Sequence, residues 1–338
     1  MLEQKVSAGW PAGFVRIQRE CQWVQSPIDE LARNYDAVEN HGWYRNLDPV
    51  LDEMETLVDD QDIVIDYSAG TGILVQQFLK RVPDRQACFV LVDASAKFLR
   101  LALEKLGADE RIAFRWIQYL KGEQRLQRLD EVLPNSLRQR GVDLLCSTNA
   151  IHLYSDLGDT LGSWMRFLKP GGMALIQSGN IANPNAPDDS WIIDTTVERI
   201  QPIARALVRD RDPYAEFRPD LEDDLRMASY DRLRAKYFLP VRPLSYYHDA
   251  LRGADFEIVD VFERAVDARV SDWGDFLSAY HEGILGWAGG SKRIEDREPS
   301  AETVALRCRL LRESLAILFE GRDSFPASWT YIKCRKPR

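Results

Sequence analysis

Short apolar runs separated by amphipathic segments organise the first half of the chain. Four of these runs predict buried strands, and they cover residues 63–66, 88–93, 112–117 and 142–152. The first run is followed by apolar residues at helical spacing, namely Ile73, Leu74, Phe78 and Leu79. The segment 168–176 predicts a helix end, a Pro-Gly turn and a further strand. Strands that alternate with helices in this way are typical of an open, mostly parallel α/β sheet.

Helical patterns flank this core on both sides. Before it, a helix is predicted to begin at Ser26, which would cap it with Pro27 at the first helical position, and a second helix covers 46–57. After it, the patterns predict helices over 191–208, 221–237, 244–251 and much of 269–326, and strands over 256–262 and 328–333.

The turn after the first strand has the composition of a ligand-binding loop. Asp66 ends the strand, and Ser68, Gly70 and Gly72 follow it directly before a helix. Glycine lets a ligand approach the backbone, and the first N–H groups of a helix attract an anionic group. Asp93 ends the second strand 23 positions after Gly70, near the roughly 20-residue spacing at which an acidic residue binds a ribose. The two glycines would equally suit close packing of a helix on a sheet, so both interpretations stay open here.

These motifs, in this order, resemble those of the class I S-adenosylmethionine-dependent methyltransferases. The likeness covers residues 60–180 and returns at 244–265 and 328–336. It rests on Val64-Ile65-Asp66 with Gly70 and Gly72, on Asp93, on Asn149 to His152, and on Lys169-Pro170-Gly171-Gly172. Ser68 stands where the family usually has its first glycine, and serine is the smallest polar substitute.

The resemblance implies a fold and a division of the chain. The fold would be α/β, a doubly wound seven-stranded and mostly parallel sheet with an antiparallel end hairpin and helical lid insertions. The segments would be an N-terminal helical cover (1–60), a Rossmann-like cofactor-binding core (61–178), a helical lid insertion (179–243), a core continuation (244–268), a second helical lid insertion (269–326) and a final core strand (327–338).

The resemblance also implies S-adenosylmethionine as the cofactor. The residues expected to contact it are Asp66, Ser68, Gly70, Gly72, Asp93, Ala94, Gln118, Tyr119 and Asn149. After the third strand the family commonly has an aspartate that receives the adenine amino group, whereas this chain has Gln118-Tyr119-Leu120. The Gln118 amide oxygen can accept from that amine, and Tyr119 or Leu120 could cover the ring face.

Methyl transfer requires a nucleophile in line with the sulfonium methyl group and, for some acceptors, a general base. His152 is the leading candidate for this base, because it follows the fourth strand at the sheet edge and imidazole titrates near neutrality. A structural role, as a helix cap or a loop hydrogen bond, is the alternative for His152. His281 in the lid is the second candidate, and Tyr35 is an aromatic residue expected near the sulfonium or the substrate.

Composition narrows the expected partners. The 338 residues carry a net charge of −9 and no long basic cluster, which argues against a nucleic-acid substrate and favours a small-molecule substrate. The five cysteines lack metal-ligand spacing, so no metal site is predicted. Their odd number, the absence of a signal-peptide core at the N-terminus and the absence of a membrane-length apolar run predict a cytoplasmic protein without membrane contact. The oligomeric state stays open.

The predicted activity is methyl transfer by in-line displacement to an oxygen, nitrogen, sulfur or carbon nucleophile held under the lid. One alternative is a nicotinamide-dependent oxidoreductase, although the loop lacks the third glycine of G-x-G-x-x-G. Another is a non-catalytic cofactor-binding protein, which would not need the Trp, Tyr and His residues of the lid. The lid's aromatic residues, together with Arg234, Arg242, Lys292 and Arg293, are compatible with a flat aromatic metabolite or a small carboxylate.

Overall fold

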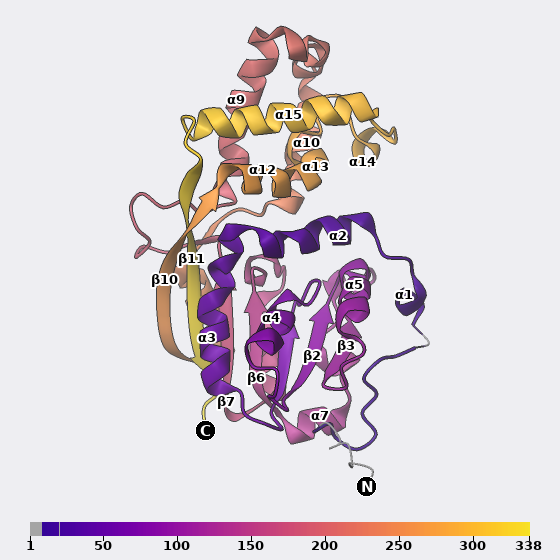
Figure 1. The fold of residues 1–338 in the computed structure, drawn as a ribbon, viewed down its shortest axis with the longest axis vertical. Coiled ribbons are helices and arrows are strands. Elements are labelled where there is room, and N and C mark those ends of the chain that lie inside the picture. The colour runs from indigo at the N-terminus through magenta and orange to yellow at the C-terminus, as the bar shows by residue number, and fades with distance from the viewer. Residues whose placement is uncertain (1–8, 20) are drawn as a thin grey trace.

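The computed structural model describes residues 9–19 and 21–338, which form an α/β part with a helical unit beyond one edge of its sheet (Figure 1). Residues 1–8 belong to the predicted N-terminal cover and include the start on which the signal-peptide prediction rests, and they lie outside the described residues together with residue 20. Within the described ranges, no helix is both long and apolar enough to cross a membrane.

A seven-stranded sheet forms the centre of the α/β part, in the order β10-β11-β7-β6-β1-β2-β3. Its strands are β1 (Ile63–Tyr67), β2 (Cys88–Asp93), β3 (Ile112–Trp116), β6 (Val142–Thr148), β7 (Leu168–Ser178), β10 (Glu257–Arg269) and β11 (Ser324–Arg335). Neighbouring strands are parallel except that β11 runs antiparallel to both β7 and β10. The predicted fold class is therefore confirmed.

The apolar runs form strands because both faces of the sheet are covered. All five residues of β1 and all six of β2 are buried. Successive side chains point to opposite faces, so Val64 joins one hydrophobic core while Ile63 and Ile65 join the other. Burying each of these side chains stabilises the fold by roughly 1.5–3 kcal/mol. The parallel order brings the carboxyl ends of β1, β2 and β6 to one edge, where the polar residues of the motifs lie.

Helices pack on both faces of the sheet. One face is covered by α3 (Asp48–Leu57), α4 (Ile73–Arg81) and α5 (Ala96–Leu106), and the other by α7 (Asn135–Arg140), α8 (Leu157–Phe167) and α11 (Leu244–Gly253). The short helices α1 (Gln22–Gln25) and α2 (Glu30–Asp36) precede them, and α2 runs across the carboxyl edge of the sheet (Figure 1). The doubly wound arrangement leaves this edge as the place where a ligand can enter.

The helical unit combines the segments that follow β7 and β10. It contains α9 (Thr195–Asp210), α10 (Asp224–Tyr237), α12 (Val270–Ala279), α13 (His281–Leu285), α14 (Lys292–Glu295) and α15 (Ala301–Leu318). The two segments are joined by a hydrogen bond from Trp273 Nε1 to Thr196 Oγ1 at 2.8 Å. The paired strands β10 and β11 continue toward this unit as a ribbon, as far as the pair Arg269 and Ser324 (Figure 1).

Several element boundaries differ from the sequence-based predictions. The helix predicted to begin at Ser26 is α2, which begins at Glu30. Asp29 rather than Ser26 caps it, accepting from the Leu31 N–H at 3.0 Å. The predicted helix over 191–208 begins later, because the Trp191 N–H donates to Pro326 O beside β11. The last two strands are longer than predicted, because they pair with each other beyond the rest of the sheet.

Candidate active site

The loop between β1 and α4 has a backbone that few residues adopt. Ser68, Gly70 and Gly72 all have positive φ, at 67°, 56° and 79°. A Cβ on Gly72 would lie 2.9 Å from side-chain atoms of Leu91 and Leu106, so this glycine is required for packing of the helix on the sheet. Gly70 instead lines a cavity. Gly72 therefore serves the packing of the helix, and the ligand-binding interpretation stays a prediction for Gly70.

Ser68 occupies a left-handed conformation that normally favours glycine. Its hydroxyl is 2.9 Å from the hydroxyl of Tyr154, which is 2.8 Å from Ser147 Oγ on β6. These hydrogen bonds hold the Ser68 side chain against the sheet, which explains how serine can replace the usual glycine without opening the turn.

Asp93 holds the glycine loop at the end of β2. One carboxylate oxygen accepts from the Gly70 N–H at 2.7 Å, and the other accepts from the Ser95 N–H at 2.6 Å. The side chain is 7% exposed, and burial raises its pKa to about 6 despite these hydrogen bonds. Each carboxylate oxygen keeps a second lone pair, so Asp93 can also accept from a ligand.

Asp66 is an unpaired carboxyl group at the end of β1. It is 1% exposed, and neither of its oxygens has a hydrogen-bond partner among the described residues. Burial, with a smaller effect from Asp93, raises its pKa to about 8. A buried carboxyl group without a partner is costly for the free protein and is well suited to a cationic ligand group.

We expect Asp66→Asn to stabilise the ligand-free protein more at pH 9 than at pH 6. The folded protein keeps the Asp66 proton up to about pH 8, whereas the unfolded chain loses it near the ordinary value of 3.8. Ionisation of the unfolded chain therefore lowers the stability as pH rises through this window, by at most about 1.4 kcal/mol per pH unit. Asparagine does not ionise, so the difference between the two proteins should widen with pH. Urea unfolding at pH 6 and pH 9 measures the free energy of unfolding of both proteins. The same difference between variant and wild type at the two pH values would contradict the raised pKa of Asp66.

A cavity of about 490 Å³ opens between this edge of the sheet, α2 and the helical unit. Aromatic rings form much of its wall, and they are Tyr35, Trp43, Tyr44, Phe98, Tyr154, Tyr237, Phe238, Trp273, Phe276, Tyr280 and Trp329. Several of these rings touch one another; for example, Trp43 is stacked on Trp329 with ring centroids 6.1 Å apart. The charged side chains in the wall are Asp93, Asp194 and the titratable His152, and no lysine or arginine of the described chain lines the cavity.

The structure brings most of the predicted site residues to this cavity. Those that line it are Tyr35, Ser68, Gly70, Asp93, Ala94, Asn149 and His152. Tyr35 lies next to the glycine loop, with its Cε1 3.5 Å from where a Cβ of residue 70 would stand, and it is stacked on Phe98. Asn149 has φ 53°, and its side-chain oxygen accepts from Trp329 Nε1 at 3.0 Å. Asn149 therefore connects the end of β6 to β11.

Other predicted residues do not line the cavity. Gln118 and Gln127 bind each other beside the small hairpin of β4 (Tyr119–Leu120) and β5 (Arg125–Leu126), and Tyr119 is 56% exposed. Leu126 from this hairpin lines the cavity instead. His281 is 3.1 Å from the guanidinium of the buried Arg307, and burial with this positive charge lowers its pKa to about 4. This contact gives His281 a packing role.

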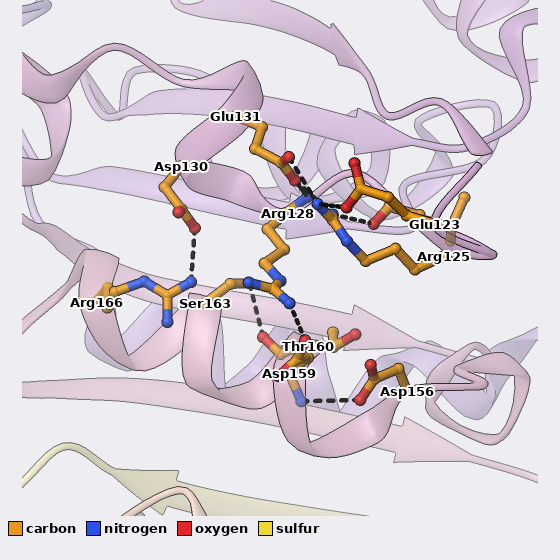
Figure 2. A network of polar contacts seen from close by, with 11 residues as sticks. Glu123, Arg125, Arg128, Asp130, Glu131, Asp156, Asp159, Thr160, Ser163 and Arg166 are labelled. Carbon is orange, nitrogen blue, oxygen red and sulfur yellow. Dashed lines mark hydrogen bonds and ion pairs between the residues drawn. The ribbon is translucent and has the colours of Figure 1, made fainter. Parts of the chain in front are cut away.

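An ion-pair network fixes the segment that carries Leu126 against α8 (Figure 2). Its pairs are Arg125 with Glu123 and Glu131, Arg128 with Asp159, and Arg166 with Asp130. A single exposed pair contributes about 0.2–1 kcal/mol, so the effect depends on several pairs acting on one segment. The network therefore positions Leu126 at the cavity from outside the site.

His152 lies at the cavity wall in a 3-10 turn (Ile151–Leu153) after β6. Its Nδ1 is 2.9 Å from Ser178 Oγ, which also accepts from the Asn180 N–H at 3.1 Å. Its Nε2 is 3.8 Å from Asp194 Oδ2. Burial lowers the pKa of His152 to about 4 and raises the pKa of Asp194 to about 7. At neutral pH the imidazole is therefore uncharged and its carboxyl neighbour titrates.

Sequence reasoning missed several wall residues. Asp194 directly precedes α9, at the start of an insertion whose packing no local pattern reveals. Ser95 and Phe98 follow Asp93 at the beginning of α5 and could have been inferred from that position. Within residues 9–19 and 21–338, no group of three or more His, Cys, Asp or Glu side chains is placed to hold a metal ion.

Comparisons with known proteins give a family model, sequence relatives and solved structures that are similar to this chain. Residues 65–174 match a family model described as a methyltransferase domain. The chain is 30% identical over 157 residues to malonyl-[acyl-carrier protein] O-methyltransferase 1 of Coxiella burnetii, covering 46% of each protein. It is 27% identical over 114 residues to tenellin synthetase of Beauveria bassiana, covering 33% of this chain and 2% of that protein. The YcgJ protein of Bacillus subtilis superposes with a TM-score of 0.47 and 14% identity, over 87% of this chain and 99% of that chain.

The chain thus spans less than half the length of these two sequence relatives. The sheet order and the glycine loop held by Asp93 define an α/β protein with a ligand site at the carboxyl edge. Residues 65–174 are thus a methyltransferase domain, and the order of the motifs is that of the class I S-adenosylmethionine-dependent methyltransferases. S-adenosylmethionine is the cofactor of this family.

Proposed function

We propose that the protein transfers the methyl group of S-adenosylmethionine to a small molecule bound in the 490 Å³ cavity. The observation that carries the proposal is the charge of the site. Asp93 and Asp194 line the cavity, and no lysine or arginine of the described chain does so. The buried Asp66 does not line the cavity, but it lies in β1 directly before the glycine loop. A sulfonium cofactor with an ammonium group suits such a site, whereas the diphosphate of a nicotinamide cofactor would meet carboxylates without a cation.

The residues present fit the cofactor. Gly70 leaves room for it, Asp93 has free lone pairs for the ribose hydroxyls, and Asp66 has no other partner for its oxygens. Phe98 and Leu126 line the cavity and supply apolar surface for the adenine. When bound, S-adenosylmethionine supplies a methyl group already activated by the positive sulfur. The chain then has to orient the acceptor, exclude water and remove a proton.

His152 is the residue we assign to the acceptor's proton. Its imidazole is uncharged at neutral pH, and when Nδ1–H is donated to Ser178, the Nε2 lone pair is free to accept. The low pKa makes the isolated imidazole a weak base, so a negative neighbour is needed once the proton has moved. Asp194 supplies a carboxylate 3.8 Å away.

A direct test uses the pure full-length protein with isotopically labelled S-adenosylmethionine and, separately, with NADH. We expect calorimetry to detect binding of S-adenosylmethionine and mass spectrometry to detect S-adenosylhomocysteine when a metabolite extract is added. Binding of NADH with transfer of hydride would favour the oxidoreductase instead. Binding of S-adenosylmethionine with no turnover in any extract would favour the non-catalytic alternative.

We further propose that the segments 179–243 and 269–326 act as a lid that selects the acceptor. We expect Tyr280→Ala to raise the KM for the acceptor by about tenfold, while the affinity for S-adenosylmethionine changes less than twofold, because the ring lies in the cavity wall contributed by the lid. Tyr246→Ala is a matched control, since Tyr246 is a partly buried tyrosine of α11 outside that wall. Equal effects of the two substitutions on the acceptor's KM would contradict the role of the lid.

A further inference from the structure

Two side chains that can accept hydrogen bonds lie side by side in the wall of the cavity. His152 Nε2 and Asp194 Oδ2 are 3.8 Å apart, which is beyond hydrogen-bond distance, and both residues line the cavity. Asp194 is at the cap position of α9, yet its side chain accepts no capping hydrogen bond from the helix. Its carboxylate is therefore available to a ligand.

The orientation of His152 is fixed from behind. Ser178 Oγ lies 2.9 Å from its Nδ1, and the Asn180 N–H donates to the same oxygen at 3.1 Å. The ring is 12% exposed, so its freedom to turn is small. Nε2 thus remains directed to the side where Asp194 lies, and the separation of the two acceptors is a property of the folded site.

The number of hydrogens on the nucleophilic atom of the substrate then decides which substrate fits. A hydroxyl or thiol has one hydrogen and can donate to either His152 or Asp194, which leaves the other side chain without a donor. A carboxylate has none and would face Asp194 with the same charge. A primary amine has two or more hydrogens and satisfies both. Aromatic rings from the lid, among them Trp273, Phe276 and Tyr280, line the same cavity, and Trp273 donates to Thr196, two positions after Asp194. Such rings favour a nitrogen that carries positive charge.

We propose that the acceptor is a primary amine whose nitrogen donates one hydrogen to His152 Nε2 and another to the Asp194 carboxylate. This inference rests on the proposed methyl transfer and names the substrate class of the same site. The sequence was compatible with either a flat aromatic metabolite or a small carboxylate. The structure argues against the carboxylate, because none of the four basic residues that could have held it lines the cavity, namely Arg234, Arg242, Lys292 and Arg293.

The methyl transfer to the amine needs only the cofactor and the two side chains described above. The nitrogen lone pair forms the new bond to the methyl carbon while the bond between that carbon and the positive sulfur breaks, and its electrons stay on sulfur. The positive charge moves to the nitrogen, which then releases one proton to His152 Nε2. The Asp194 carboxylate stabilises the resulting imidazolium. The products are the methylated amine and the neutral thioether.

The experiment compares acceptors that share one skeleton. 2-Phenylethylamine, 2-phenylethanol and phenylacetate, with the same trio built on an indole ring, are titrated into the full-length protein saturated with S-adenosylhomocysteine. Turnover is then followed with S-adenosylmethionine. We expect at least one amine to bind at least tenfold more tightly than its alcohol and carboxylate partners and to be methylated on nitrogen. If no amine is preferred, including the case in which none of the compounds binds, the inference is overturned.

Variants connect this preference to Asp194. Asp194→Asn keeps the shape but replaces one acceptor oxygen with a donor, and it should lower the amine's affinity at least tenfold while leaving that of the alcohol within twofold. Asp188→Asn makes the same change of charge at an exposed neighbouring position outside this cavity and should leave the preference unchanged. An unchanged preference in Asp194→Asn would overturn the inference. Methylation of a hydroxyl or carboxylate would overturn it and leave the proposed function standing, whereas failure of the wild type to bind S-adenosylmethionine would overturn the proposed function itself.

Discussion

Asp93→Ala is expected to weaken the binding of S-adenosylmethionine at least tenfold. The substitution removes hydrogen bonds to the ribose, which are charge-assisted and together contribute roughly 1.5–3 kcal/mol. It also removes the two bonds, at 2.7 and 2.6 Å, by which the carboxylate holds the N–H groups of Gly70 and Ser95. The loss therefore combines a missing contact with a loosened loop, which is why it should rank among the largest single effects.

Calorimetry on the folded variant measures this loss. Asp84→Ala serves as the control, because Asp84 is an exposed acid that follows the C-terminal end of α4, whereas the glycine loop precedes the N-terminal end of that helix. Unchanged affinity in a well-folded Asp93→Ala protein would remove Asp93 from the cofactor site. Gly70→Val should weaken binding further, since its φ of 56° disfavours a branched residue and its side chain would point toward Tyr35.

His152→Ala is expected to lower turnover by about 10²–10⁴-fold while the affinity for S-adenosylmethionine changes little. The reason is that Nε2 lies beside Asp194, 3.8 Å from its carboxylate, and is the atom we assign to the acceptor's proton. Steady-state kinetics with an identified acceptor, together with calorimetry for the cofactor, separates the two effects.

A structural role for His152 makes a different prediction. If its bond to Ser178 serves packing alone, His152→Ala would lower the melting temperature with a modest kinetic change. Wild-type turnover of the variant at neutral pH, where the imidazole of His152 is uncharged and can accept a proton, would remove His152 from the mechanism. Ser178→Ala gives a second measurement: a positioning role predicts a lower kcat with little change in the acceptor's KM, because Nε2 remains present but is held less firmly.

Local sequence patterns were enough to place several of the predicted cofactor residues at one edge of the sheet. The apolar runs of β1 and β2 identify buried strands, and parallel strands place their carboxyl ends at one edge, so Ser68, Gly70 and Asp93 had to lie near one another. Two of the predicted adenine contacts do not reach the cavity, because the chain forms a hairpin at that point. Gln118 and Tyr119 enter a small hairpin that turns them away, and Leu126 from its second strand takes the place at the cavity.

The part of the cavity around His152 could not be predicted from the sequence. His152 was found because it follows a strand, yet its neighbours come from three other places: Ser178 ends β7, Asn180 follows it, and Asp194 precedes α9. His281 had a comparable sequence context but is held by Arg307 of α15. Which histidine reaches the cavity depends on how the insertions pack, and helical periodicity specifies which face is buried without specifying the surface that buries it.

The sequence by itself determined the α/β class, the strand-end positions of the cofactor residues and the family resemblance, because these follow from short-range periodicity and from the fixed geometry of parallel strands. The tertiary structure alone decided the composition of the cavity wall: two hydrogen-bond acceptors at 3.8 Å, a wall of aromatic rings and no cation from the described chain. Those properties arise from contacts between segments more than 40 positions apart, such as His152 with Asp194, and such contacts are set by side-chain packing that no local pattern records.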